Sequence, residues 1–168
     1  EKGYSGTSLK DVAQHLGLTD AAIYYYMNNK RELLFQCYLR AVDAGEDAMS
    51  LGERFDGPGF ARAEVYLTRH VELLCGNSGP FAIMSEIPAL EDDERAVILR
   101  QSRQHSRRFE SMLQQGVEDG SIKDCDIRMT GNAIMGSINW IPKWFRGDSA
   151  QASQIVATFP RVLLGGLK

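Results

Sequence analysis

The chain has 168 residues, which is close to the size of one domain or of a small module joined to a larger one. Nineteen Lys and Arg residues stand against 22 Asp and Glu residues, giving a formal net charge of −3, which excludes a strongly basic nucleic-acid coat. With 43% hydrophobic and 24% charged residues, the composition is that of a folded globular protein.

The cysteines are widely separated and form no CxxC pair; they are Cys37, Cys75 and Cys125. This pattern argues against a disulfide framework and against a metal site, and it fits a reducing cytoplasm. No apolar run approaches the ~18 residues that a membrane span requires. We therefore expect a cytoplasmic protein that uses no metal or cofactor and does not contact a membrane.

Hydrophobic residues recur at steps of three and four almost throughout the chain, and alternating β-branched runs are missing. The expected fold is therefore all-α. We predict helices over residues 7–16, 19–27, 29–48, 60–75, 90–115, 126–145 and 150–164, with a short helical piece over 81–86. Pro142 and Pro160 lie inside the last two long helices, where each is expected to kink or end its helix.

Two short helices near the N-terminus form the clearest functional pattern. Ser8, followed by Asp11, resembles a capping box at the start of the first helix. Gly17 then ends that helix, and Thr19 caps the second. This layout is typical of a helix-turn-helix, which offers its second helix to the major groove of DNA. The side chains expected to face inward are Val12, Ala13 and Leu16 on the first helix, and Ile23 and Met27 on the second.

The second helix is expected to present two tyrosines to DNA. With Ile23 and Met27 facing inward, a rotation of ~100° per residue turns Tyr24 and Tyr25 outward, where a phenol can donate to phosphate oxygens. The competing interpretation is that the tyrosines at 24–26 pack inside a helical bundle. The residues expected to contact DNA are Thr7, Ser8, Lys10, Thr19, Ala21, Ala22, Tyr24, Tyr25 and Lys30.

About the first 40 residues resemble the DNA-binding domain of TetR-type repressors. The resemblance rests on Gly3-Tyr4, Thr7-Ser8-Leu9, Val12-Ala13, Leu16-Gly17-Leu18-Thr19, Ile23-Tyr24, Tyr26, and Lys30 with Leu33-Leu34. It implies an all-α homodimer that binds operator DNA through the residues named above, and that a small molecule releases. Met27 departs from the aromatic residue that is common in the family at its position, and Asp20 places a negative charge at the start of the second helix.

The resemblance also implies a further helix before Glu1. Residues 1–34 contain four basic and four acidic side chains, a neutral balance for a DNA reader. We therefore expect that preceding helix to supply positive charge, and a fragment starting at Glu1 to bind DNA more weakly than a longer protein.

A turn-rich stretch marks the predicted domain boundary. Residues 51–59 contain three glycines and a proline. Residues 1–48 are expected to form the helix-turn-helix domain with its connecting helix, and residues 49–168 a ligand-binding and dimerisation bundle.

The helix predicted over 90–115 has an apolar stripe that Ser102, His105 and Ser106 interrupt. Polar atoms on an otherwise buried face are typical of a ligand pocket. The alternative for His70 and His105 is a core histidine whose neighbours satisfy its hydrogen bonds. The side chains expected to line the pocket are Tyr66, His70, Leu74, Phe81, Met84, Ser102, His105, Phe109, Met112 and Trp140.

Arg100, Arg103 and Arg107 form a row at steps of three and four beside Arg108. Such a row is usually a solvated face, with residues 91–94 supplying nearby acids. The sharper hypothesis is an anion site for a charged ligand such as an acyl-coenzyme A thioester, because arginine binds phosphate and carboxylate bidentately.

The last two long helices carry more hydrophobic surface than one small domain readily covers. We expect this surface to form a twofold four-helix interface between two copies of the chain. Its hydrophobic residues are Ile134, Ile138, Trp140, Ile141, Trp144, Phe145, Ile155, Val156, Phe159, Val162 and Leu163.

Together these patterns predict a ligand-responsive transcriptional repressor whose effector is an acyl-CoA or another hydrophobic compound. An enzyme is not expected, because His15, His70 and His105 form no recognisable pairing with a Cys, Ser or acid, and no glycine-rich phosphate loop or metal motif occurs. The alternative is a helical ligand-binding carrier or adaptor that does not bind DNA.

Overall fold

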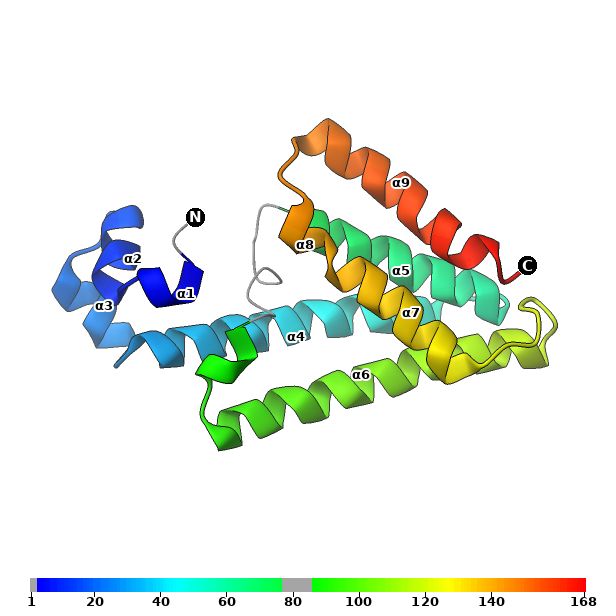
Figure 1. Cartoon of the computed structure of the whole chain (residues 1–168), viewed down its shortest axis with the longest axis horizontal. Helices are drawn as coiled ribbons and strands as arrows, with labels where there is room; N and C mark the ends of the chain where they lie inside the picture. Colours follow the sequence, from blue (N-terminus) through cyan, green and yellow to red (C-terminus); the bar gives the residue numbers. More distant parts are fainter. Residues whose placement is uncertain (1–2, 77–85) are drawn as a thin grey trace.

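The computed structural model describes residues 3–76 and 86–168, and every regular element in these ranges is helical, which confirms the predicted all-α class. A small N-terminal group, α1 to α3, connects through α4 to a larger bundle (Figure 1). The helices are α1 (Gly3–Gly6), α2 (Leu9–His15), α3 (Asp20–Tyr26), α4 (Lys30–Arg54), α5 (Gly59–Cys75), α6 (Asp92–Glu118), α7 (Ile127–Asn139), α8 (Ile141–Trp144) and α9 (Ser149–Gly165).

The predicted caps of α2 and α3 are present. The Ser8 hydroxyl accepts from the Asp11 N–H while the Asp11 carboxylate accepts from the Ser8 N–H, so the capping box is confirmed. Gly17 adopts a left-handed φ of 67°, which ends α2 and turns the chain toward α3. The Thr19 hydroxyl accepts from the Ala22 N–H at 3.1 Å and caps α3.

A small separate core holds α2 against α3. Leu9, Ala13 and Ile23 are its buried members. The prediction that Leu16 is buried is wrong, because it lies just past the last turn of α2 and is 60% exposed. The helix-turn-helix geometry therefore depends on few apolar contacts and on the caps.

The connecting helix α4 is longer than predicted. The sequence places its end before Ser50, but the helix continues to Arg54. Gly52 is buried within α4, at a point where a Cβ atom would lie 2.7 Å from the Cβ of Tyr66 and 2.9 Å from the carbonyl oxygen of Arg62. This glycine allows α4 and α5 to approach closely, and it does not end the helix.

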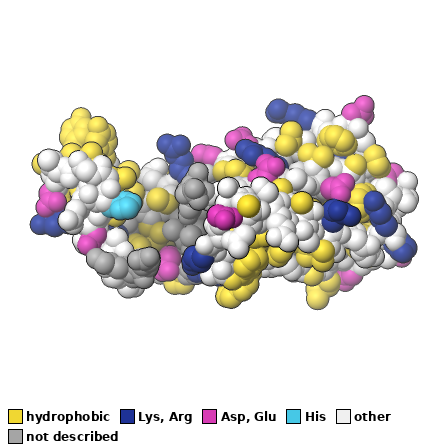
Figure 2. Space-filling model, turned by 90° about the horizontal axis from the view of Figure 1, so that it is seen from above, with side chains coloured by type: hydrophobic (Ala, Val, Ile, Leu, Met, Phe, Trp, Pro, Cys, Tyr) yellow, Lys and Arg dark blue, Asp and Glu magenta, His cyan; other side chains and the backbone are white. Residues whose placement is uncertain are grey.

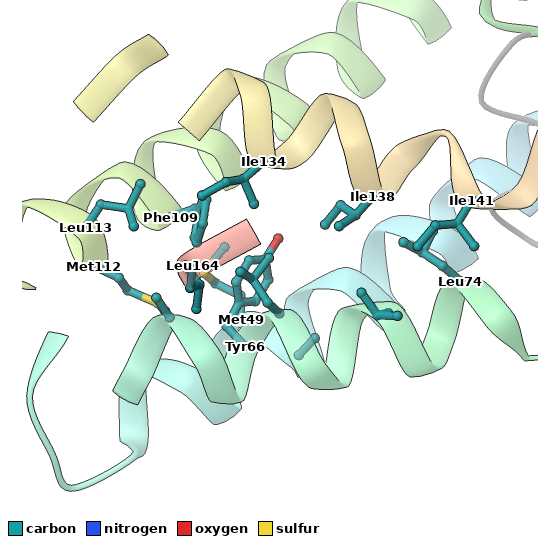
Figure 3. Close-up of a cluster of buried hydrophobic side chains, with 14 of the residues drawn as sticks. Met49, Tyr66, Leu74, Phe109, Met112, Leu113, Ile134, Ile138, Ile141 and Leu164 are labelled. Atoms are coloured by element: carbon teal, nitrogen blue, oxygen red, sulfur yellow. The ribbon is translucent and has the colours of Figure 1, made fainter. Parts of the chain in front are cut away.

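The main hydrophobic core lies in the larger bundle. Figure 3 shows its buried side chains, which come from α4 (Met49), α5 (Tyr66 and Leu74), α6 (Phe109, Met112 and Leu113), α7 (Ile134 and Ile138), α8 (Ile141) and α9 (Leu164). The rings of Tyr66 and Phe109 lie with their centroids 5.1 Å apart near its centre. Because α4 contributes to this core and also begins beside the N-terminal group, it joins the two parts of the chain, and Tyr4 of α1 packs against a second cluster that contains Leu90 and Ile98.

The C-terminal helices differ from the prediction at the two prolines. The helix expected over 126–145 is broken at Trp140, and Pro142 occupies the first turn of α8, where a missing N–H costs nothing. In contrast, α9 runs through Pro160, whose ring is buried in the bundle. The helical piece predicted over 81–86 lies outside the described residues except for Glu86, and residues 86–89 form a 3₁₀ turn.

We predict that Gly52→Ala destabilises the protein. The added methyl group overlaps the backbone of α5, so the two helices must separate, at a cost of about 1–3 kcal/mol in the free energy of unfolding. Denaturant unfolding followed by circular dichroism measures this cost. Gly136→Ala is the matched control, since a Cβ at that position of α7 meets nothing within 4 Å. Equal stability of the two variants would contradict the close approach.

Candidate functional site

The outer surface of α3 is formed by three adjacent tyrosines. Tyr24, Tyr25 and Tyr26 are 49%, 83% and 69% exposed, so the competing interpretation that they pack inside the fold is wrong. The rings of Tyr25 and Tyr26 meet edge to face with centroids 5.1 Å apart. Figure 2 shows hydrophobic side chains gathered at the end of the molecule that carries α2 and α3. Large exposed aromatic groups on a short helix provide a contact surface for a partner.

Several predicted DNA contacts meet in one surface hollow beside α3. Thr7, Ser8, Tyr24 and Lys30 line this hollow. The Lys30 ammonium group donates to the carbonyl oxygen of Tyr4 at 2.7 Å and lies 4.3 Å from the centre of the Tyr4 ring. The lysine is therefore held in a defined position and only partly exposed.

The other predicted contacts surround the start of α3. Lys10 and Asp20 are both exposed and form an ion pair of 3.2 Å, so the aspartate offsets part of the local positive charge. The Thr19 hydroxyl serves as the helix cap described above. Ala21 is exposed and Ala22 is half-buried, leaving the first turn of α3 free of bulky groups.

A cavity of about 100 Å³ lies between α4, α5, α6 and α7. Of the predicted pocket residues, His70, Ser102 and His105 line it. The predicted pocket includes no residue of α4, because helical periodicity does not show which helix lies opposite α6. The described residues that line the cavity are Tyr38, Ala41, Val42, Gly45, Glu46, His70, Ile98, Gln101, Ser102, His105, Ser106, Met135 and Asn139.

The remaining predicted pocket residues lie elsewhere. Tyr66 stands directly behind His105, and the structure places Leu74, Phe109 and Met112 in the main core. Trp140 is 63% exposed at the end of α7 and does not line the cavity. Two further residues, Phe81 and Met84, lie outside the described residues.

A hydrogen-bonded chain runs from the core to the cavity wall. His105 Nδ1 lies 3.5 Å from Glu46 Oε1, and its Nε2 lies 2.7 Å from the Tyr66 hydroxyl oxygen. A carboxylate only accepts hydrogen bonds, so we assign the ring proton to Nδ1, and the Tyr66 hydroxyl then donates to Nε2. Both nitrogens of His105 are therefore engaged by the protein.

Arg108 of α6 extends this chain along α4. Its guanidinium group contacts Glu46, which already faces His105, and forms a two-pronged ion pair with Glu53 at 2.7 Å. The hydrogen bonds from Arg108 lower the pKa of Glu53. A cluster with planar two-pronged geometry fixes relative position better than an isolated surface pair does. Arg108 thus binds the α6 side of the cavity wall to α4.

Both histidines at the cavity are held in the neutral form. Burial, followed by the nearby charge of His105, lowers the pKa of His70 to about 3, with a hydrogen bond to Asn139 acting in the opposite direction. Burial also lowers the pKa of His105, although Glu46 opposes this change. Near pH 7 these rings therefore add no positive charge to the cavity.

The arginine row does not face the cavity. Arg100, Arg103 and Arg107 are exposed on α6. At ~100° per residue they lie roughly opposite the face that carries Gln101 and His105. Arg108 is different, because it turns toward α4. The three-residue row is therefore a solvent-facing surface on the far side of α6.

The predicted hydrophobic surface of the last helices divides into three parts. Ile134, Ile138 and Ile141 belong to the main core. Others are partly buried against that core; they are Phe145, Ile155, Val156, Phe159 and Leu163. The exposed members of the C-terminal helices, together with Met129 on α7, remain as an uncovered apolar surface; they are Met129, Trp140, Trp144 and Val162. Exposed apolar groups of this size mark a contact with another protein surface.

Within residues 3–76 and 86–168, no group of three or more His, Cys, Asp or Glu side chains is arranged to hold a metal ion. In the same ranges, no helix combines the length and the hydrophobicity needed to cross a membrane.

We predict that acid destabilises the fold through the buried histidines. Below the ordinary pKa of 6.5, the unfolded chain takes up protons that folded His70 excludes until about pH 3. The free energy of unfolding should therefore fall as the pH drops from 6.5 toward 3, with an uptake of up to about one proton per shifted histidine. Urea unfolding at a series of pH values measures this slope.

His70→Gln should flatten that pH dependence, whereas the same substitution at the exposed His15 should leave it unchanged. If the His70→Gln protein loses stability as steeply as the original protein between the same pH values, His70 is not the group responsible.

Both parts of the chain match known protein families. Residues 1–37 match the family described as bacterial regulatory proteins, tetR family, and residues 56–167 match the family described as tetracyclin repressor-like, C-terminal domain. The fatty acid metabolism regulator protein of Bacillus subtilis (strain 168) is 24% identical over 170 residues, which cover 97% of this chain and 84% of that protein.

Two solved structures share the fold over nearly the whole chain. The TetR family transcriptional regulator PfmR from Thermus thermophilus has a TM-score of 0.83 and 29% identity, covering 99% of this chain and 92% of that one. AibR, in complex with isovaleryl coenzyme A and operator DNA, has a TM-score of 0.83 and 23% identity, covering 99% and 91%. The chain belongs to the tetR family of bacterial regulatory proteins.

Proposed function

We propose that the chain is a ligand-responsive transcriptional repressor. As a homodimer it binds operator DNA through α2 and α3, and a small hydrophobic effector in the cavity releases it. This function includes no catalytic step, in keeping with a family of regulatory proteins. Such a regulator acts in the cytoplasm, where its operator lies.

The observation that carries the proposal is the double role of α4. One uninterrupted helix of 25 residues begins beside the hollow next to α3, where Lys30 is its first residue, and it also contributes Gly45 and Glu46 to the cavity wall. A ligand that moves this wall therefore moves the base of the DNA-reading helices. Coupling of this kind typically amounts to ~1–3 kcal/mol, enough to change operator occupancy severalfold or more.

A twofold dimer provides the geometry for such control. Two recognition helices fit successive major grooves only when their centres are ~34–36 Å apart. The exposed apolar residues of α7, α8 and α9 supply a surface that a second copy can cover. A tilt of α4 in each copy then changes the separation of the two α3 helices.

The comparison with AibR supports an effector of the acyl-CoA class, since that relative of the same fold was solved with isovaleryl coenzyme A and operator DNA together. A carrier or adaptor that does not bind DNA would account for the cavity, but it would not account for the exposed tyrosines on α3.

The decisive experiment is a DNA-binding titration of the full-length protein against the duplex upstream of its own gene, followed by fluorescence anisotropy at several salt concentrations. We expect salt-sensitive, sequence-dependent binding. Tyr25→Ala should weaken binding by about tenfold through loss of a hydrogen bond to a charged phosphate. The thermal stability of this variant should not change, because the side chain is 83% exposed. Ligand binding without any DNA binding would favour the carrier.

Lys30 is predicted to neutralise one phosphate. Lys30→Ala should reduce the slope of log K against log salt by ~1, and Lys30→Arg should retain the slope. Lys123→Ala is the matched control, because Lys123 is exposed in the loop between α6 and α7 and does not line the hollow beside α3. A slope that Lys30→Ala does not change would rule out the phosphate contact.

A further inference from the structure

The cavity is small for a ligand site. A cavity of about 150 Å³ in a protein core holds one benzene molecule, so a cavity of ≈ 100 Å³ holds a group of about four or five heavy atoms. Ala41, Val42, Ile98 and Met135 give it an apolar wall. Long alkyl chains and fused ring systems exceed this space, whereas a short branched or straight alkyl group fills it.

The charges around the cavity disfavour an anion inside it. Among the described residues that line it, the charged side chain is Glu46, and none is Lys or Arg. Arg108 directs its guanidinium group to Glu46 and Glu53. A free carboxylate would therefore meet a negative neighbour without a cation of its own.

The histidines do not supply that cation. His105 turns Nδ1 toward Glu46 and accepts from Tyr66 at Nε2, which fits a neutral ring. His70 is buried and its pKa is lowered to about 3, so it too is neutral near pH 7. Polar groups that suit an uncharged carbonyl are present on the same wall, in the side chains of Gln101, Ser102 and Asn139.

We propose that the cavity selects an uncharged short acyl group of about three or four carbons, which makes about four or five heavy atoms with its carbonyl oxygen, carried as a thioester, and excludes both the corresponding free acid and long-chain acyl groups. This inference rests on the proposed function and specifies the effector of the same site. The thioester form matters because it converts the carboxylate into a neutral carbonyl.

Gly45 sets the depth of this cavity. It is buried in α4 and lines the wall opposite the two histidines. A Cβ atom there would lie 3.4 Å from Cε1 of His105 and 3.9 Å from Cε1 of His70, which are ordinary contact distances. Alanine therefore fits without displacing the backbone, but its methyl group occupies space that the ligand needs. Alanine also favours the helix over glycine, so the variant should fold.

The test is a series of acyl-CoA thioesters of increasing chain length, from acetyl through butyryl, isovaleryl and octanoyl to palmitoyl, with free isovalerate and free coenzyme A as the uncoupled parts. Binding to the full-length protein is measured by calorimetry, and release from operator DNA by anisotropy. We expect the tightest binding at butyryl, and affinity weaker by about tenfold or more for octanoyl and palmitoyl. Isovalerate and coenzyme A alone should not release the operator.

Gly45→Ala should move the optimum to a shorter acyl group and weaken isovaleryl-CoA binding by about tenfold. Gly165→Ala, which also adds a methyl group inside a helix but lies at the C-terminal end of α9, away from the cavity, should leave the chain-length profile unchanged. Tightest binding of a long-chain thioester, equal binding of free isovalerate, or an unchanged profile in Gly45→Ala would overturn this inference.

The operator titration distinguishes a failure of the acyl-group selectivity from a failure of the proposed function. A protein that binds its operator but responds to long-chain or anionic compounds retains the proposed function and lacks this selectivity. A protein that binds no DNA under any of these conditions fails at the proposed function itself.

Discussion

The fold and the function both depend on how α4 is fastened to its neighbours. Glu46 and Glu53 lie on α4 two turns apart, and Arg108 of α6 binds both of them. On a neighbouring face of the same helix, Gly52 brings the backbone close to Tyr66 of α5. The ion pairs of Arg108, called the clamp below, and the close contact at Gly52 therefore position α4 against the bundle. Because α2 and α3 precede α4 in the chain, a movement of α4 also moves them.

The contacts that attach α4 are polar beside the cavity and apolar in the core behind it. The chain from Tyr66 through His105 to Glu46 engages both ring nitrogens of His105, and such networks specify one arrangement of helices because a partly broken network is costly. A ligand that changes the position of His105 acts on the same carboxylate that holds Arg108. The cavity and the clamp thus share Glu46, which connects the cavity wall to the ion pairs between α4 and α6.

The α2–α3 unit is built differently. Its small core and its caps leave most of its surface free, including the three tyrosines of α3, and its charges are balanced locally by the pair of Lys10 and Asp20. A unit of this kind contributes shape and a few defined contacts rather than a strong positive field. The larger bundle therefore acts on the α2–α3 unit through its position. In a dimer, α4 of each copy sets where the two α2–α3 units lie on one DNA duplex.

The amino-acid sequence by itself determined the features that depend on neighbours along the chain. The all-α class, the Ser8 and Thr19 caps, the stop at Gly17 and the outward tyrosines follow from helical periodicity and from backbone hydrogen bonding within a few residues. Only the tertiary structure decided that Gly45 lies beside the two histidines of the cavity and that Gly52 lets α4 approach α5. It also decided that α9 continues through Pro160 and that Trp140 lies outside the cavity. Those outcomes depend on which helix lies opposite each residue, and contacts between distant segments leave no periodic trace in a single sequence.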